Sequence, residues 1–125
     1  MTEGASTSGV KEVRLRKEQF IILAVLLGHE PASDKKGFDL QADAMSTGWL
    51  PVIGLMDKLQ EIGYRSNFVA DIKEMQREGV IDVPQTQLGA SAKVTELGKA
   101  FVSNWKNALP ILFEFPHQWL AYKVK

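Results

Sequence analysis

The segment from Tyr64 to Val102 constrains the fold most, because its residue pattern predicts a helix, two strands and a second helix in succession. Its first part carries apolar residues at helical spacing, namely Phe68, Ile72, Met75 and Val80. This period predicts a helix with one buried face. Gly79 tolerates the left-handed conformation that ends many helices, so we expect the helix to stop there.

The chain after Gly79 has the pattern of a β-ribbon that leads into a helix. Val80–Val83 is typical of a short, half-buried strand. The turn formers of residues 84–91 would return the chain through a second strand at Lys93–Val94. Thr95 is a good N-cap for the helix that follows, since its hydroxyl can accept from a free main-chain N–H.

A further helix is expected before this segment, over Pro51–Ile62. Its apolar residues form one stripe, made of Val52, Leu55, Met56, Leu59 and Ile62. Pro51 suits the first helical position, where a missing N–H costs little, and Gly63 closes the helix. Only three residues separate Gly63 from Asn67, and Ser66 or Asn67 can cap the next helix. So short a connection is typical of two helices that cross at a steep angle.

The N-terminal half contains one strongly apolar stretch. Glu18–Leu27 is apolar all round, which favours a helix that runs through the core. Val10–Lys17 alternates apolar and charged residues, and it is either a short strand or the entry to that helix. Residues 1–9 are small and polar, so we expect a disordered tail there. A loop over residues 29–37 and a weak helical turn over 38–45 complete this half.

The C-terminal part is rich in large apolar residues. We expect the last helix to run from Thr95 to near Pro110, with Leu97, Phe101, Trp105 and Ala108 facing the core. Beyond it lie further large side chains, namely Phe113, Phe115, Trp119, Leu120 and Tyr122. These groups need a covering surface. Two alternatives stay open: they close over Phe20–Leu27, or they form a contact between subunits.

The composition limits the class of protein. A chain of 125 residues suits one domain, which we place at residues 10–125. It has no cysteine, which is typical of a reducing, cytoplasmic setting. The longest apolar run, Phe20–Leu27, has eight residues, and a membrane-spanning helix needs roughly 20. No apolar signal segment stands near the N-terminus. We therefore expect a cytoplasmic protein that does not bind membranes.

No arrangement of residues for catalysis stands out. The only histidines, His29 and His117, are expected at the surface or at an interface rather than around a metal. Motifs for phosphate-cradling glycine loops, nucleophile elbows and zinc sites are absent. Three tryptophans could line a ligand cavity, although packing in the core or at an interface is the preferred interpretation. We expect neither enzyme activity nor a cofactor or metal.

Two motifs resemble a known superfamily. Residues 72–81 (IKEMQREGVI) and 94–100 (VTELGKA) resemble the recognition helix and the wing-to-helix junction of winged helix-turn-helix transcriptional regulators. The likeness is closest to the MarR-like and PadR-like families of bacteria and archaea, and it covers about residues 50–102. It implies a mainly α fold with a small β-hairpin wing and extra terminal helices. The helix-turn-helix would occupy about 51–78 and the wing about 80–95.

The same resemblance implies a DNA-binding transcriptional regulator that forms a homodimer through its terminal helices. The second helix of the pair would enter the major groove of duplex DNA, led by its N-terminal residues. If Phe68, Ile72 and Met75 face inward, helical geometry turns the following residues outward: Ser66, Ala70, Lys73, Glu74 and Arg77. The residues expected at the DNA are Arg65, Ser66, Asn67, Lys73, Arg77, Gln85, Gln87 and Lys93.

The charge of the chain keeps a second interpretation open. Fifteen basic and fifteen acidic residues give a net charge of zero, and residues 61–101 hold five basic against six acidic residues. Residues 84–91, the tip of the expected wing, contain no Arg or Lys. Because phosphate contacts supply most non-specific affinity for DNA, the alternative is a winged helix that binds another protein. DNA binding is favoured if one face gathers the basic residues Arg14, Arg16, Lys17, Arg65, Lys73, Arg77 and Lys93.

Overall fold

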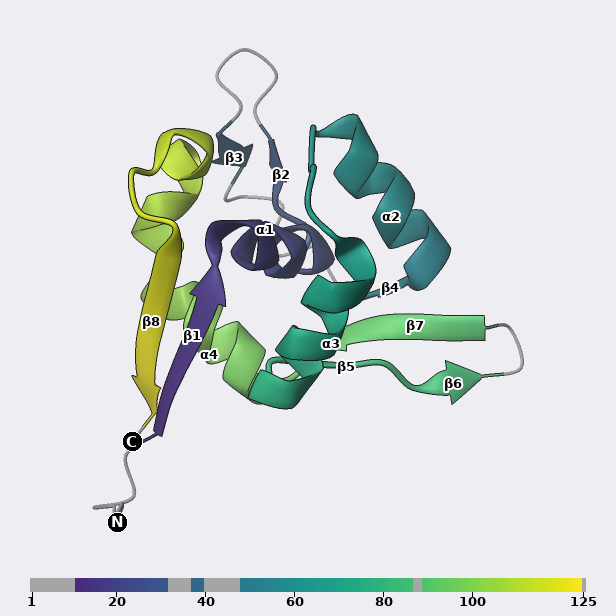
Figure 1. The fold of residues 1–125 in the computed structure, drawn as a ribbon. Helices are drawn as coiled ribbons and strands as arrows, with labels where there is room; N and C mark the ends of the chain where they lie inside the picture. The colour runs from purple at the N-terminus through teal and green to yellow at the C-terminus, as the bar shows by residue number, and fades with distance from the viewer. Residues whose placement is uncertain (1–10, 32–36, 40–47, 87–88, 125) are drawn as a thin grey trace.

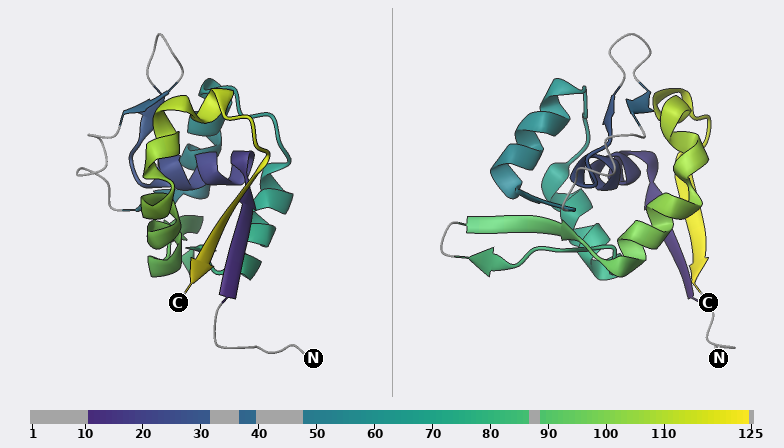
Figure 2. Two further views of the ribbon diagram at one scale, coloured as in Figure 1. Left: turned by 90° about the vertical axis from the view of Figure 1, so that its left-hand side faces the viewer. Right: turned by 180° about the vertical axis from the view of Figure 1, so that it is seen from behind.

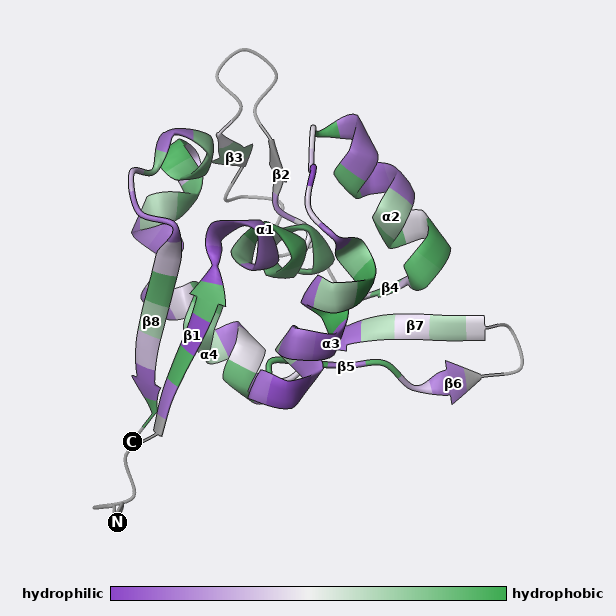
Figure 3. Cartoon of the chain, viewed as in Figure 1, coloured by the Kyte–Doolittle hydropathy of each residue, from purple (hydrophilic) through white to green (hydrophobic). Residues whose placement is uncertain are grey.

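Helix α1 (Lys17–Leu26) runs through the middle of the molecule, with the other helices and the sheets around it (Figure 1). The computed structural model describes residues 11–31, 37–39, 48–86 and 89–124, which form a mixed α/β fold with small antiparallel sheets. All residues of α1 from Gln19 to Leu26 are buried. Figure 3 shows the same helix as hydrophobic over most of its length. The prediction of a core helix is therefore confirmed.

Helices α2 (Val52–Glu61) and α3 (Phe68–Glu78) follow each other across a short turn. The Asn67 side chain accepts a hydrogen bond of 3.1 Å from the main-chain N–H of Ala70, so it caps α3 as expected. Gly79 ends α3 in the left-handed conformation, with φ 83°. Pro51 was expected inside α2, but it is extended, with ψ 142°, and it precedes the first helical residue.

Strand β7 (Gly89–Val94) is the centre of the main sheet. It pairs antiparallel with β4 (Trp49–Pro51) and β5 (Ile81–Asp82), and near its start with β6 (Gln85–Thr86). The β6–β7 ribbon projects from the body of the molecule (Figures 1 and 2). Sequence reasoning expected a shorter strand at Lys93–Val94 and missed β4, because three residues carry too little periodicity to reveal a strand.

Thr95 locks the junction between the sheet and helix α4 (Glu96–Asn104). Its hydroxyl accepts a hydrogen bond of 3.1 Å from the Gly98 N–H and donates one of 2.6 Å to the Gly79 carbonyl. Its main-chain N–H donates to the Val80 carbonyl at 3.0 Å. One residue thus caps α4 and ties it to the end of α3.

We expect Thr95→Ala to lower the free energy of unfolding by about 1–2 kcal/mol, because it removes the cap of α4 and leaves the Gly79 carbonyl without its hydroxyl donor. Urea unfolding followed by circular dichroism measures the change. Thr95→Ser keeps the hydroxyl and is expected to retain most of the stability. A serine variant as unstable as the alanine variant would show that the methyl group, not the hydroxyl, matters.

The last α-helix is shorter than expected. It ends at Asn104, and a 3₁₀ helix (Lys106–Glu114) follows with Pro110 inside it. The single helix expected to reach Pro110 is therefore wrong. The main-chain N–H of Trp105 donates to both the Phe101 and the Val102 carbonyl, at 3.2 and 3.1 Å, so the last turn of α4 already tightens toward the 3₁₀ geometry that follows.

The two ends of the chain form a ribbon of two strands. Strand β1 (Lys11–Arg16) pairs antiparallel with β8 (Trp119–Val124), and Leu15 lies directly opposite Leu120. Both leucines are fully buried. The strand alternative for the N-terminal lead-in is thus the correct one. The prediction of extra terminal helices is wrong, because the terminal elements of the described chain are strands.

Most of the apolar C-terminal part packs on the core, as the first of the two alternatives expects. Leu109, Leu112 and Leu120 are fully buried, and the Trp105 indole donates to the Ala121 carbonyl at 2.9 Å. Among the large side chains of this part, Trp119 stays 48% exposed. Packing against α1 explains most of the large apolar residues there without a second subunit.

A small hairpin replaces part of the expected loop and helical turn. Strand β2 (Glu30–Pro31) pairs with β3 (Phe38–Asp39), so Phe38 and Asp39 are extended rather than helical. The Phe38 ring stacks on the Phe113 ring, with centroids 5.6 Å apart, and this contact outweighs the weak helical signal. The rest of the expected turn and the tail of residues 1–9 lie outside the described residues.

Candidate nucleic-acid interface

Helix α3 presents one exposed stripe that bears positive charge. Its exposed residues are Val69, Ala70, Lys73, Gln76 and Arg77. Lys73 and Arg77 are four positions apart and therefore lie on the same face of the helix. The structure thus brings these two predicted site residues together, as their spacing required.

The acidic residues of α3 are less exposed than the residues of this stripe. Asp71 is fully buried. Glu74 is half-buried and accepts a hydrogen bond of 2.7 Å from the Gln19 side chain, and Glu78 is also half-buried. The exposed residues of α3 therefore include two bases and no acid, although residues 61–101 as a whole carry a small excess of acids.

Asp71 is held by donors from three other parts of the chain. Its carboxylate accepts from the Arg16 guanidinium at the end of β1 and from the Tyr64 hydroxyl in the α2–α3 turn. Gln19 of α1 donates to it at 3.4 Å. We call Asp71, Arg16, Gln19 and Tyr64 the Asp71 cluster. It fixes α3 against α1, and it pairs the Arg16 guanidinium with an acid of the protein itself.

Burial raises the pKa of the Tyr64 phenol above its ordinary value of 10.0, and the charge of Glu18 acts in the same direction. A hydrogen bond with Ser66 and the charge of Arg16 oppose this effect. The phenol therefore keeps its proton at neutral pH, which it needs in order to donate to Asp71. Sequence reasoning missed the cluster, because its members are up to 55 positions apart.

The turn before α3 carries three of the predicted site residues. Arg65 is exposed and donates to the Tyr64 carbonyl at 3.0 Å. Ser66 is half-buried, and Asn67 is exposed but uses its side-chain oxygen to cap α3. All three lie at or just before the N-terminus of α3, which is the end that leads into a groove when a helix reads DNA.

The predicted wing residues lie on strands β6 and β7 rather than on α3. Lys93 is exposed on β7 directly opposite Asp82 of β5, so an acid faces it across the sheet. Its neighbours Ala92 and Val94 are buried, so Lys93 points to the outer face of the sheet, away from the core. Gln85 is exposed on β6. Gln87 lies outside the described residues.

The single basic face that sequence reasoning named as the test for DNA is not formed in full. The Arg14 guanidinium lies over the Trp119 ring of the terminal ribbon, 5.5 Å from its centroid. Arg16 is bound to Asp71, and the Lys17 ammonium donates to the Phe115 carbonyl at 3.3 Å. The bases left exposed on α3 and the turn before it are Arg65, Lys73 and Arg77.

Apolar side chains are also exposed on the two helices. Ile53 of α2 is 77% exposed and Val69 of α3 is 60% exposed. Met56 of α2 is partly exposed as well, next to the exposed acid Asp57. This part of the surface does not suit a phosphate backbone, and it bears on the alternative that a protein binds here.

The histidines take different places. His117 is exposed, whereas His29 is buried, so the expected surface or interface position is wrong for His29. The main-chain N–H of His29 donates a hydrogen bond of 3.0 Å to the Ala24 carbonyl, so His29 lies close to the end of α1. No group of three or more potential metal ligands occurs in the part of the chain that the structure describes.

Comparisons with known proteins found no relative of this chain. The chain matches no protein-family model, no curated protein and no solved structure. Among the described helices, none is long and apolar enough to cross a bilayer.

Proposed function

We propose that the chain is a winged-helix transcriptional regulator that binds duplex DNA, with α2 and α3 as the helix-turn-helix and the β6–β7 ribbon as the wing. The order α2, α3, β5, β6, β7 supports the proposal, because the resemblance implies two helices followed by a β-hairpin wing. Fold alone does not carry the function. The proposal that α3 binds DNA depends on which charged side chains of α3 face solvent.

The observation that carries the proposal is the separation of charge on α3. Lys73 and Arg77 face solvent, whereas Asp71 is buried against Arg16 and Glu74 is held by Gln19. A helix that enters a groove needs its outward face free of acids, because each acid would repel nearby phosphates. Arg65 and the N-terminus of α3 lie at the leading end, where backbone N–H groups attract phosphate.

The test is the fluorescence anisotropy of a labelled mixed-sequence duplex, titrated with the protein at several salt concentrations. We expect binding that weakens steeply as salt rises, since each phosphate contact releases about one counterion. An absence of binding even at low salt would contradict general DNA affinity. A selection from random duplexes would then be the remaining check on a strictly sequence-specific binder.

Replacing Lys73 and Arg77 together by glutamine is expected to weaken duplex binding at least about tenfold and to reduce the salt slope by about 2. The same titration measures both values. Lys99→Gln with Lys123→Gln is the matched control, because it removes two exposed positive charges elsewhere. Equal affinity of the Lys73/Arg77 variant and the control would remove α3 from the interface.

The second candidate is a winged-helix module that binds another protein. The exposed Ile53, Met56 and Val69 favour it, and so does the absence of Arg and Lys from residues 84–91. Failure to bind DNA, together with capture of a protein partner that Ile53→Ser and Val69→Ser abolish, would support this candidate. Partner capture that both variants leave intact would place the contact elsewhere.

A homodimer remains part of the first proposal, although the terminal elements are strands rather than helices. Light scattering coupled to size-exclusion chromatography tests it. We expect a molar mass of twice the 13.9 kDa of one chain. The mass of a single chain at micromolar concentration would contradict a homodimer of the free protein.

A further inference from the structure

The first turn of α3, which is its leading end in the proposed complex, presents two apolar side chains to solvent. Val69 and Ala70 are the second and third residues of the helix. Val69 is 60% exposed, and Ala70 is exposed as well. Contacts with phosphates need polar or basic side chains. If this end of α3 meets DNA, its apolar pair must therefore contact a different part of the duplex.

Val69 lies on the same side of the helix as two exposed polar residues. Lys73 follows it by four positions and Gln76 by seven, so the three side chains form one row along α3. Arg77 is exposed next to this row. Phosphates bound by Lys73 and Arg77 would hold the groove against this side of the helix. The base edges would then replace water around Val69.

Asn67, just before the helix, already uses its side chain within the protein. Its amide oxygen accepts the hydrogen bond of 3.1 Å from the Ala70 N–H that caps α3. The usual contact of asparagine with adenine needs the oxygen and the nitrogen of the amide together. Asn67 therefore cannot turn its amide to adenine without giving up the cap.

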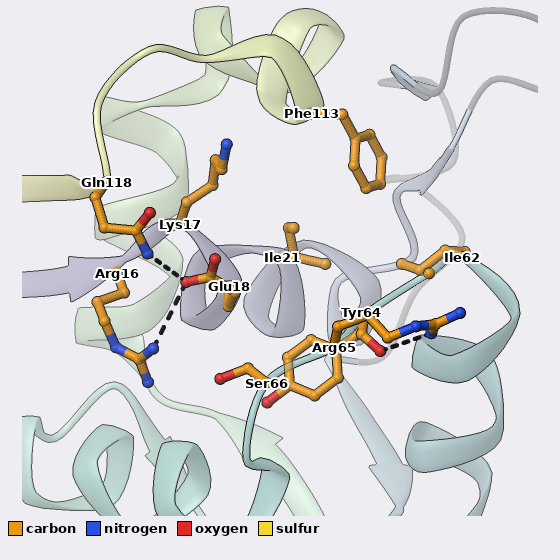
Figure 4. A pocket seen from close by; sticks show the side chains of 11 residues that line it. Arg16, Lys17, Glu18, Ile21, Ile62, Tyr64, Arg65, Ser66, Phe113 and Gln118 are labelled. Carbon is orange, nitrogen blue, oxygen red and sulfur yellow. Dashed lines mark hydrogen bonds and ion pairs between the residues drawn. The ribbon is translucent and has the colours of Figure 1, made fainter.

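The other polar residues of the turn also bond within the turn. Ser66 is half-buried and shares a hydrogen bond with the Tyr64 side chain. The Arg65 guanidinium donates to the Tyr64 carbonyl at 3.0 Å (Figure 4). Val69 and Ala70 have no polar side-chain atoms to commit in this way. They remain as side chains of the leading end that are free to contact a base.

Thymine carries the group that suits this apolar pair. Its methyl group projects into the major groove, where the other base edges present mainly hydrogen-bond donors and acceptors. Apolar side chains are the usual contacts of this methyl group. The branched side chain of Val69 offers two methyl groups of its own. Contact between them would remove apolar surface of both partners from water.

We propose that Val69, flanked by Ala70, reads the methyl group of thymine in the major groove. The protein would then prefer duplexes with an A·T pair, in one orientation, where the start of α3 meets the DNA. This inference rests on the proposed function and deepens it. Lys73 and Arg77 attract any duplex through its phosphates, whereas Val69 selects among sequences.

The experiment uses the full chain and a pool of duplexes with a randomised core. After selection, the enriched duplex is prepared again with each thymine in turn replaced by deoxyuridine, which removes the methyl group and keeps the base pair. Fluorescence anisotropy measures each affinity at one salt concentration. At the position that faces Val69, we expect the replacement to weaken binding about three- to fivefold, which is the effect of losing one buried methyl group.

Val69→Ser identifies the side chain that makes the contact. We expect this variant to bind the thymine duplex about as weakly as the unchanged protein binds the deoxyuridine duplex, and to bind both duplexes equally. Ile53→Ser is the matched control, because Ile53 of α2 is 77% exposed and also branched. It is expected to keep the full difference between the two duplexes. Circular dichroism confirms that each variant is folded.

The possible failures of the inference and of the proposed function give different results. An enriched sequence with no fixed A·T pair, equal affinities for all the deoxyuridine duplexes, or a thymine preference that Val69→Ser keeps would each overturn the role of Val69. In these three cases the protein would still bind DNA. If no duplex binds even at low salt, both the proposed function and the inference are wrong.

Discussion

Replacing Asp71 by alanine is expected to lower the free energy of unfolding by about 3 kcal/mol, because it leaves buried donors without an acceptor and Arg16 without its counter-charge. The Tyr64 hydroxyl is buried with Asp71, so water cannot easily replace the carboxylate there. Arg16 is partly exposed and can recover some hydration, which is why we expect a value at the lower end for a broken buried ion pair. Urea unfolding measures the change.

The matched control for Asp71 is Asp82→Ala. Asp82 is an exposed acid opposite Lys93 on the sheet, and its loss is expected to cost less than about 0.5 kcal/mol. A double-mutant cycle with Arg16→Met then isolates the part of the loss that belongs to the Arg16–Asp71 pair. A cost for Asp71→Ala no greater than that of the control would mean that the Asp71 cluster does not stabilise the fold.

Gly98→Ala is expected to lower the free energy of unfolding by about 3 kcal/mol, because the added methyl group has no room. A Cβ at this position would lie 2.2 Å from the Val80 carbonyl oxygen and 2.7 Å from a Val94 methyl carbon. The Val80 oxygen already accepts from the Thr95 N–H, so the main chain cannot move away without losing that bond. Thermal and urea unfolding measure the loss.

Gly54→Ala provides the opposite result with the same chemical change. Gly54 lies within α2, and an added Cβ there would have no heavy atom within 4 Å. Alanine stabilises an open helical position relative to glycine by about 0.5–1 kcal/mol. We therefore expect the two alanine variants to differ in sign. Similar effects from both would mean that α4 does not approach Val80 as closely as the structure describes.

The Asp71 cluster and the Thr95–Gly98 junction matter for the proposed function because both hold α3 in place. The Asp71 cluster ties α3 to α1, and the Thr95–Gly98 junction ties the end of α3 to α4. Loss of either tie would be expected to weaken DNA binding without any change in Lys73 or Arg77. A DNA-binding defect in such a variant should therefore be read together with its stability.

The signals that predicted structure correctly from the sequence are local. The cap at Asn67, the left-handed Gly79 and the cap at Thr95 each depend on residues within four positions, and all three hold in the structure. The helical period of α3 likewise placed Lys73 and Arg77 on its outer face. It also placed Glu74 there, but the hydrogen bond from the Gln19 side chain holds Glu74 half-buried. The all-round apolar character of residues 18–27 predicted the core helix for the same kind of reason.

Other features were decided by partners far along the chain. The pairing of β1 with β8 joins residues more than one hundred positions apart, and neither strand shows which partner it takes. Asp71 is one of the six acidic residues that the sequence counted against DNA binding. It is buried because Arg16 and Tyr64, from distant parts of the chain, donate hydrogen bonds to it. Local steric and capping preferences act within one or two turns, so the sequence by itself determined the core helix, the α2–α3 pair and the caps at Asn67, Gly79 and Thr95. Long-range packing alone decided how the ends of the chain pair and which charges reach the surface.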